Sequence, residues 1–528
     1  MRRFNIGLDR RQSRIAACLV VLLGVFAAAG SARAAPCTDP LAAEATLRPG
    51  FRENLDLDAL RRFYASAPVC VWSDESAATL TDILAKAAAH GLDPQDFHLG
   101  ELARPAALLD ERQRDLLLSD AAIRYARDMR NGRVELESIE GDVDFPRPVM
   151  DPAAELRGAI SRNATEEWLA ALPPRQPEYA RLVDAYAIYR VMAARGGWDV
   201  LPPPEKSLRP GQASNLVPAL GRRLRAEGDL AETYATSEGG ERFEGRVVEA
   251  LEHFQRRHGL DADGILGKKT LAALNVGAAE RMAQIAMNLE RWRILAGAIQ
   301  PTRVEVNAAA ATAALIVDGK PALTMRTVVG KKKTPTPIMR SVIGSIVVNP
   351  PWVVPASIAR KEILPLLKRR PAYLAENDMY WRDNQIVQAP GEKNSLGRLK
   401  FELASFFDVY LHDTPARSLF ARDDRARSHG CVRLEKPLEL AERLLEDDPR
   451  WPRERIEAAI AEGATLRIPI VNDIPVVILY WTSFVDEDGT VEFRDDLYGR
   501  DARLMAALER RKPAPLAENT SAPKACGV

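Results

Sequence analysis

The sequence SHGCVRL at residues 428–434 sets Cys431 between a glycine and a short apolar run. A cysteine reacts as its thiolate, so a neighbouring imidazole or backbone N–H groups must lower the thiol pKa before it can act near neutral pH. The chain has six histidines, and only His412 and His429 fall within twenty residues of Cys431. The stretch therefore indicates a cysteine nucleophile with a histidine partner.

The two histidines have different expected roles. His412 ends the apolar run VYL at 409–411, which predicts a ring held at the end of a strand, as a catalytic base requires. His429 is only two residues from the cysteine, so we expect it to frame the loop rather than reach the sulfur. A turn through Gly430 would direct the N–H groups of Gly430 and Cys431 at one point and stabilise an oxyanion.

Arg433 follows the cysteine by two residues, and its guanidinium would hold a substrate carboxylate in a bidentate contact. Two other interpretations stay open on spacing alone. A cysteine beside valine is often a small buried hydrophobic residue, with a nearby histidine on the surface. Zinc binding is the weaker of these two interpretations. A structural zinc site needs four ligands, and this stretch offers one cysteine and two histidines without a paired C-x-x-C.

The chain is too long for one domain, since its 528 residues exceed the roughly 250–300 that one hydrophobic core accommodates. Helical spacing of apolar residues dominates the first half, and short β-type runs dominate after residue 301. Residues 355–378 return to helix-forming residues, which predicts a helical insertion in a β-rich domain. The expected class is a multidomain α+β protein.

The expected domains follow from these changes in pattern. They are a signal peptide at 1–34, a helical domain at 35–205, a three-helix module at 206–276, a linker helix at 277–300, a β-rich domain at 301–505 with an insertion at about 355–390, and a tail at 506–528. The module's helices are expected near 216–225, 243–257 and 268–274. A hairpin is expected from 476–485 and 491–494, joined by the Asp-Gly turn at 488–489.

Composition and charge exclude other classes. Hydrophobic residues make up 46% and charged residues 28%, as in soluble globular proteins, and 73 basic residues balance 73 acidic ones. The net charge of +0 gives no global attraction to nucleic acid. The arginine-rich start, short apolar run and A-x-A ending of residues 1–34 predict a leader, with no stable membrane span after cleavage; an uncleaved anchor is the alternative.

Export would place the remaining cysteines in an oxidising compartment. Cys37 would then pair with Cys70 or with Cys526, or remain unpaired, and the sequence alone leaves these three arrangements open.

Residues 428–434, preceded by YLHDTP at 410–415, resemble the active-site signature of the L,D-transpeptidases, bacterial cell-wall enzymes with a β-rich catalytic fold. The nineteen-residue step between histidine and cysteine matches that pattern. The resemblance implies that Cys431 is the nucleophile and His412 the base. It also implies an active-site loop and oxyanion site made by Ser428, His429 and Gly430, and substrate contacts from Arg433, Trp352, Tyr410 and Asp413.

Other stretches carry the same resemblance. TPTP at 334–337, NPPW at 349–352, QAPG at 388–391 and residues 480–499 are similar to the large periplasmic members, which have a helical scaffold domain, a peptidoglycan-binding module and a helical cap inserted in the catalytic domain. FQRRHGL at 254–260 and DGILG at 263–267 resemble the peptidoglycan-binding module; a spacer that binds nothing is the alternative. Because Asp413 stands where some relatives have Ser or Gly, a backbone carbonyl is an alternative partner for His412.

The resemblance implies a periplasmic L,D-transpeptidase that needs no metal or organic cofactor. Cys431 would form a thioester with a tetrapeptide stem, release D-Ala, and transfer the stem to the meso-diaminopimelate amine of another. The implied partners are peptidoglycan stem peptides and glycan. Other cell-wall synthases are a further partner that the resemblance allows. Carboxypeptidation, D-amino-acid exchange or lipoprotein attachment would use the same site, and a non-catalytic peptidoglycan-binding protein is the alternative from another class. A carbapenem is expected to acylate Cys431.

Overall fold

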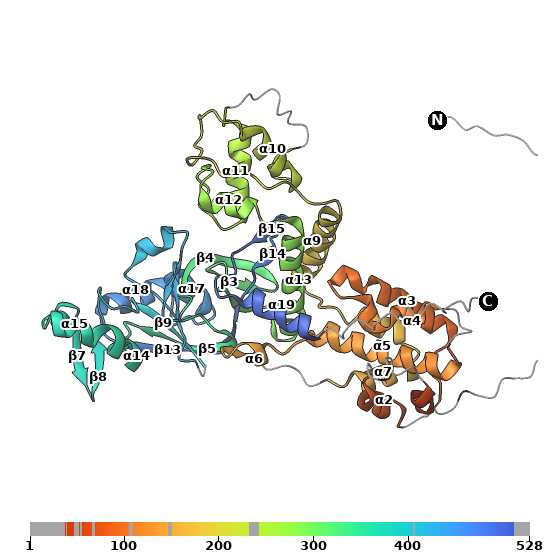
Figure 1. The fold of residues 1–528 in the computed structure, drawn as a ribbon. Helices are drawn as coiled ribbons and strands as arrows, with labels where there is room; N and C mark the ends of the chain where they lie inside the picture. Colours follow the sequence, from red (N-terminus) through yellow and green to blue (C-terminus); the bar gives the residue numbers. More distant parts are fainter. Residues whose placement is uncertain are drawn as a thin grey trace, which may run out of the picture.

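The computed structural model describes residues 37, 40–46, 52, 55–65, 69–104, 109–145, 150–231, 242–404 and 407–511. The predicted leader, Cys526 and the end of the predicted tail lie outside these residues. Three bodies meet around the helices α9 (Pro177–Ala194) and α13 (Ala278–Leu295): a helical N-terminal body, a small helical module and a β-rich body (Figure 1). None of the helices in the described part of the chain has the length and apolar character needed to cross a bilayer.

The N-terminal body packs short helices around one long helix, α5. Its helices are α2 (Leu57–Tyr64), α3 (Asp74–Lys86), α4 (Leu99–Leu102), α5 (Glu111–Asn131), α7 (Pro152–Ser161) and α8 (Thr165–Ala170). The short helix α6 (Leu136–Ile139) packs instead into the core shared with the β-rich body. Asp110 begins α5 with a capping box to Gln113, and α5 buries leucines and alanines on several sides. This body is the predicted helical domain, with a core of its own.

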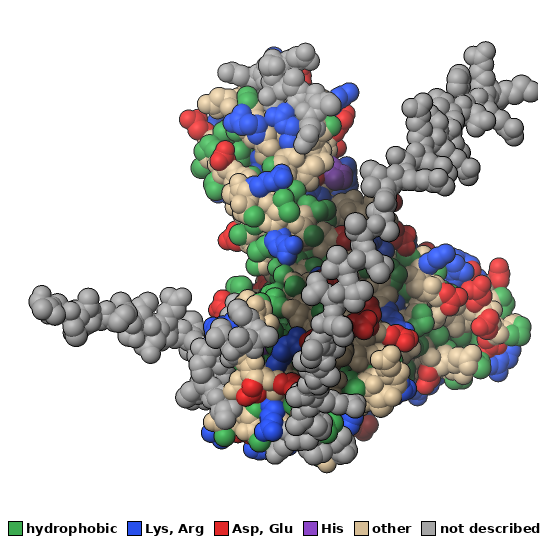
Figure 2. All heavy atoms as spheres, turned by 90° about the vertical axis from the view of Figure 1, so that its right-hand side faces the viewer, with side chains coloured by type: hydrophobic (Ala, Val, Ile, Leu, Met, Phe, Trp, Pro, Cys, Tyr) green, Lys and Arg blue, Asp and Glu red, His purple; other side chains and the backbone are tan. Residues whose placement is uncertain are grey.

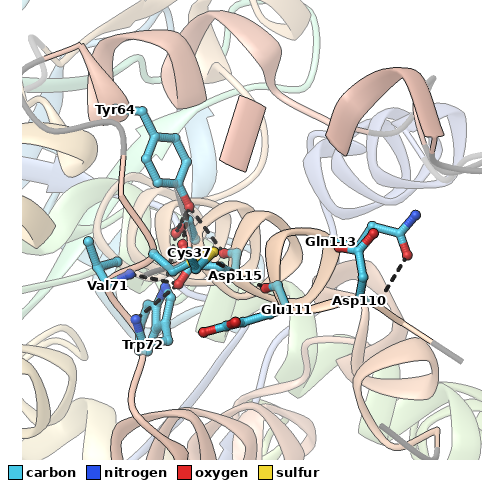
Figure 3. Close-up of a disulfide and its surroundings, with 10 residues drawn as sticks. Cys37, Tyr64, Val71, Trp72, Asp110, Glu111, Gln113 and Asp115 are labelled. Carbon is cyan, nitrogen blue, oxygen red and sulfur yellow. Dashed lines mark hydrogen bonds between the residues drawn. A yellow bond between two sulfur atoms is a disulfide. The ribbon is translucent and has the colours of Figure 1, made fainter. Parts of the chain in front are cut away.

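A disulfide joins Cys37 to Cys70 near the start of α5, which selects one of the three arrangements left open by the sequence (Figure 3). The backbone N–H groups of Val71 and Trp72, next to Cys70, donate to the buried Asp115 carboxylate at 2.7 and 3.0 Å. The disulfide therefore ties the start of the described chain to the central helix.

The small module forms from three helices as expected: α10 (Val217–Ala226), α11 (Arg246–Arg257) and α12 (Lys268–Leu274). Leu220, Leu251 and Phe254 are fully buried at its centre. His258, at the end of α11, stacks between Phe254 and Phe493 of the β-rich body, with ring centroids 3.9 and 5.3 Å away. The module is thus docked through a shared aromatic contact.

The sheet of the β-rich body closes on itself. Strand pairing runs β5-β13-β2-β3-β4-β12-β10-β9, and β9 pairs again with β5. The strands are β2 (Arg303–Asn307), β3 (Thr312–Val317), β4 (Lys320–Gly330), β5 (Ile338–Val348), β9 (Leu399–Leu403), β10 (Leu411–His412), β12 (Val432–Leu434) and β13 (Leu466–Leu479), with β11 (Ala426–Ser428) paired to β4. The expected α+β multidomain class is confirmed.

One further strand of this sheet comes from the N-terminal body. β1 (Val143–Asp144) pairs in parallel with the start of β5, in the register Val143 to Ile338. β9 covers β5 only from Ile343 onward, so β1 covers an edge that would otherwise be open.

Several helices surround the sheet. They are α17 (Pro437–Leu444), α18 (Arg453–Glu462) and α19 (Arg500–Arg511), which crosses from the predicted β-rich domain into the predicted tail. The expected linker helix is α13, and much of it is buried, with Trp292 stacked on Trp481 at 4.8 Å. It joins the core shared by the N-terminal and β-rich bodies.

The predicted insertion projects from one side of the β-rich body (Figure 1). It contains α14 (Ala356–Ile358), a π-helical turn (Ala359–Ile363), α15 (Leu364–Arg369) and α16 (Tyr373–Glu376). A small sheet accompanies these helices, made from β6 (Trp352–Val353), β8 (Gln385–Gln388) and β7 (Met379–Arg382). We call residues 352–388 the cap.

The predicted hairpin is shorter than expected. Residues 476–479 belong to β13, and the hairpin is β14 (Ser483–Val485) with β15 (Val491–Phe493). The break has a physical cause: the Trp481 and Thr482 N–H groups donate to the side chains of Asn307 and Asn288 at 3.1 and 3.0 Å. Side-chain acceptors thus replace a strand partner at this point.

Candidate active site

Two neighbouring strands bring the predicted nucleophile and base together. β10 and β12 are parallel, with Leu411 opposite Val432 and His412 opposite Arg433. Leu411 and Val432 are completely buried on the core side. Since side chains alternate along a strand, His412, Arg433 and the preceding Cys431 project to the other face.

Cys431 is half-buried, and it is the only cysteine outside a disulfide in the described residues. Its Sγ lies 3.8 Å from the Asp408 carbonyl oxygen, in a weak S–H hydrogen bond. Burial raises the pKa of the thiol, while a hydrogen bond with the Tyr410 backbone and the charge of Arg433 act in the opposite direction. The resting side chain is therefore a neutral thiol.

His412 is buried and also neutral at rest. Burial, together with the charge of Arg433, lowers its imidazole pKa to about 3. Hydrogen bonds with the Asp413 and Leu396 backbones act in the opposite direction and raise the pKa. Its Nδ1 lies 2.5 Å from the Asp413 carbonyl oxygen. Nδ1–H donation to that oxygen leaves Nε2 unprotonated, as a general base requires.

The Asp413 side chain does a different task from its backbone. Its carboxylate accepts from the Arg398 N–H at 2.8 Å and from the Arg417 guanidinium at 3.2 Å. A Cβ at Gly397 would fall 2.4 Å from this carboxylate, so the neighbouring turn needs glycine. The carboxylate fixes the loop beside His412, and the backbone carbonyl holds the ring.

Ser428 shapes the turn that carries Cys431. Its Oγ accepts from the Gly430 N–H at 3.1 Å and donates to the Cys431 carbonyl at 2.6 Å. Gly430 has φ 122°, a conformation that glycine adopts without strain. In this conformation the Gly430 N–H is directed at Ser428 rather than at an oxyanion position.

His429 points toward the cap. Its Nε2 lies 2.6 Å from Glu362 Oε1, on the π-helical turn, and 3.5 Å from Lys331 Nζ. No sequence pattern marks Glu362, because only the fold brings it to the loop. The π-helical turn that carries it is a feature often found at functional sites.

Arg433 presents an unpaired cation beside the thiol. It forms no ion pair with any described residue, its Nε has no hydrogen-bond partner among them, and burial lowers its pKa. Nearby, Lys400 Nζ lies 4.3 Å above the Tyr410 ring, and burial with the adjacent Cys431 raises the Tyr410 pKa to about 12. This face of the sheet is suited to an anionic group.

Trp352, a predicted substrate contact, lies on the cap together with two further aromatic residues, Tyr380 and Trp381. Trp352 is half-buried against the cap's small core, whereas Tyr380 and Trp381 are 44% and 54% exposed. Trp352 therefore packs on the cap core, whereas the side chains of Tyr380 and Trp381 are exposed to solvent.

A cavity of about 500 Å³ lies next to the loop that holds His412. Asp413, Gly397 and Arg398 line it together with Arg417 and Glu435. Because Asp413 also holds the His412 ring, this cavity adjoins the predicted base.

Three family models match the chain in the same order as the three bodies. They are described as a scaffold domain at residues 58–185, a putative peptidoglycan binding domain at 214–274, and an L,D-transpeptidase catalytic domain at 301–468, which contains both His412 and Cys431. A curated "Putative L,D-transpeptidase" of Haemophilus influenzae is 34% identical over 245 residues, or 42% of this chain and 49% of that protein. The chain thus spans about half the length of that relative.

Solved structures of L,D-transpeptidases also match, at low overall similarity. The catalytic domain from E. faecium acylated by ertapenem is 16% identical, with a TM-score of 0.19 over 34% of this chain and 98% of that one. An L,D-transpeptidase from Stackebrandtia nassauensis is 13% identical, with a TM-score of 0.20 over 53% of this chain and 97% of that one. At these scores they add no structural argument.

Proposed function

We propose that this chain, a member of the L,D-transpeptidase family with a scaffold domain and a putative peptidoglycan binding domain, makes direct cross-links in peptidoglycan. Cys431 attacks the amide between the L-centre of meso-diaminopimelate and the terminal D-Ala of a tetrapeptide stem. D-Ala leaves, and a thioester remains. The side-chain amine of a second stem then replaces the sulfur.

The observation that carries the proposal is that His412, on β10, and Cys431, directly before the adjacent strand β12, lie on one face of the sheet. Both groups are neutral at rest, so the Sγ proton passes to His412 as sulfur attacks, and then to the D-Ala nitrogen as the C–N bond breaks. In the second half, the acceptor amine gives a proton to His412 and the sulfur recovers it. A covalent intermediate divides one difficult step into two.

Arg433 supplies the electrostatic part of the proposal. Because no described carboxylate pairs with it, its guanidinium is available to a substrate carboxylate. The stem peptide offers such groups, at the D-Ala terminus and on diaminopimelate. This contact orients the stem so that the reacting carbonyl lies over Cys431.

The cap supports transfer over hydrolysis. The contact between Glu362 and His429 brings the cap to the loop that carries Cys431. A closed cap excludes water from the thioester, so the amine of the second stem reacts first. Exposed Trp381 and Tyr380 are suited to contacts with the apolar faces of substrate.

The setting of this activity is the cell wall in the periplasm. The putative peptidoglycan binding domain supports binding to glycan or stem peptides, and the sequence of residues 1–34 supports export. Figure 2 shows Lys and Arg side chains interspersed with Asp and Glu over the described part of one face, as the equal numbers of charges lead us to expect. The function needs neither a metal nor an organic cofactor.

The test is mass spectrometry of muropeptides after incubating the purified protein with disaccharide tetrapeptide. A dimer that has lost one D-Ala, absent with Cys431→Ala, supports the proposal. Tripeptide without dimer assigns carboxypeptidation instead. Unchanged substrate, together with no mass gain from ertapenem, contradicts thiol chemistry at this site.

A further inference from the structure

A chain of contacts connects the N-terminal body to the loop that carries the nucleophile. Thr336, between two prolines and completely buried, donates its Oγ1–H to the Gly430 carbonyl at 2.8 Å. The same hydroxyl accepts from the Gly330 N–H at 2.9 Å. One hydroxyl thus fixes both the active-site turn and the end of β4.

The Thr336 backbone is held from the other side by Arg500. Its Nη2 donates to the Thr336 carbonyl at 3.1 Å and to Asp142 Oδ2 at 2.6 Å, and its Nη1 lies 2.9 Å from Glu140 Oε2. Arg500 is completely buried and lies beside the rings of Tyr480 and Tyr498, which stack on each other. A buried ion pair is stable only when its charged atoms lie close together in good geometry, because both charges have lost the stabilisation of solvating water.

The strand β1 adds a second connection between the same parts. The Ile338 N–H, two residues beyond Thr336, donates to the Asp142 carbonyl at 3.0 Å, and Val143 pairs with Ile338. Asp142 therefore holds the 336–338 segment with its backbone and, through Arg500, with its side chain. Prolines at 335 and 337 restrict that segment, so movement at Asp142 has few other ways to be absorbed.

We infer that Thr336 is a positioning residue for Cys431, and that residues 140–144 of the scaffold domain hold it in place through Arg500. The hydroxyl sets the Gly430 carbonyl, and that carbonyl sets the direction in which the next residue, Cys431, presents its sulfur to His412. The scaffold domain therefore helps to hold the active-site loop in position, in addition to packing beside the β-rich body. The inference rests on the proposed thiol chemistry of Cys431.

Two matched pairs of variants in the full-length protein test it. Thr336→Val removes the hydroxyl at nearly constant shape, and Thr336→Ser keeps it. Asp142→Asn weakens the link to Arg500, and Asp144→Asn removes the same charge two residues further on, at a residue with no ion pair among the described residues. The readouts are the second-order rates of Cys431 acylation by ertapenem and of its alkylation by iodoacetamide, below the melting temperature of every variant.

We expect Thr336→Val to be acylated about 10-fold more slowly, as the loss of one buried hydrogen bond predicts, with Thr336→Ser restoring the rate to within about twofold. Asp142→Asn is expected to slow acylation about threefold relative to Asp144→Asn. Equal rates for Thr336→Val and wild type, equal losses for the valine and serine variants, or equal rates for the two aspartate variants would each overturn the inference.

The two readouts separate this inference from the proposed function. If wild type reacts with iodoacetamide but not with ertapenem, the proposed function fails. Alkylation of Cys431 across the same variants then still decides whether Thr336 positions the thiol. If Thr336→Val does not fold, the aspartate pair decides the question.

Discussion

The neutral state of the proposed catalytic pair, Cys431 and His412, predicts an unusual pH dependence for Cys431 acylation. Burial lowers the His412 pKa to about 3 and raises the thiol pKa. Both groups therefore keep their resting protonation from pH 5 to pH 8. We expect the second-order rate of acylation by ertapenem to change by less than about twofold over that range, because the reacting form is the neutral thiol beside the neutral imidazole.

The magnitude follows from the position of the His412 pKa. With a pKa of about 3, only about 1% of His412 is protonated at pH 5. With the ordinary pKa of about 6.5, about 97% would be protonated, and loss of the base would slow acylation about 30-fold at pH 5. The two cases are easily distinguished by stopped-flow or by intact-mass measurements.

The control is His412→Asn, which removes the base without adding charge. Acylation of this variant has to proceed through the free thiolate, so its rate should rise about 10-fold per pH unit below the thiol pKa. A wild-type profile that falls through a midpoint near pH 6.5 would show that His412 titrates normally, and would refute the neutral-pair argument.

Three further predictions concern the cap, the disulfide of the N-terminal body and the docking of the small module. Glu362→Gln keeps the shape of the contact with His429 but removes its charge, so the cap closes less tightly and the share of hydrolysed tripeptide relative to dimer rises in muropeptide analysis. Replacing Cys37 and Cys70 by serine opens a loop of 33 residues, which should cost about 3–4 kcal/mol in the melting of the N-terminal body; an unchanged melting temperature would contradict this. Burial holds the pKa of His258 well below its usual value, so docking of the module is fully stable above about pH 6.5 and loses about 1.4 kcal/mol per pH unit below it. X-ray scattering should detect release of the module at pH 5, and His258→Phe should suppress that change.

The proposed pair, Cys431 and His412, could be singled out from the sequence because its signals are local. The run at 409–411 placed His412 at a strand end, and β10 ends at that residue. The three helices of the module were also predicted closely, since apolar periodicity within a segment determines them. For Asp413, the alternative that a backbone carbonyl contacts His412 matches the observed geometry.

The missed features depend on contacts between distant parts of the chain. Glu362 is 67 residues from His429, and Thr336 is 94 residues from Gly430, so no local pattern connects either pair. The error at 476–485 has the same origin. The apolar run continues through residue 481, and only the side chains of Asn288 and Asn307 end the strand there.

The origin of β1 bears on how the catalytic body can be studied. The first part of β5 has β13 on one side and β1 on the other, and β9 takes over the second side only from Ile343. A fragment that begins at residue 301 would lack β1, leaving an open strand edge at Ile338 and removing both acidic partners of Arg500. A buried guanidinium without partners is strongly destabilising, and an open edge favours aggregation. The 301–468 match therefore marks a sequence family boundary within a larger cooperative structure, in which the segment that completes the sheet lies more than 150 residues upstream.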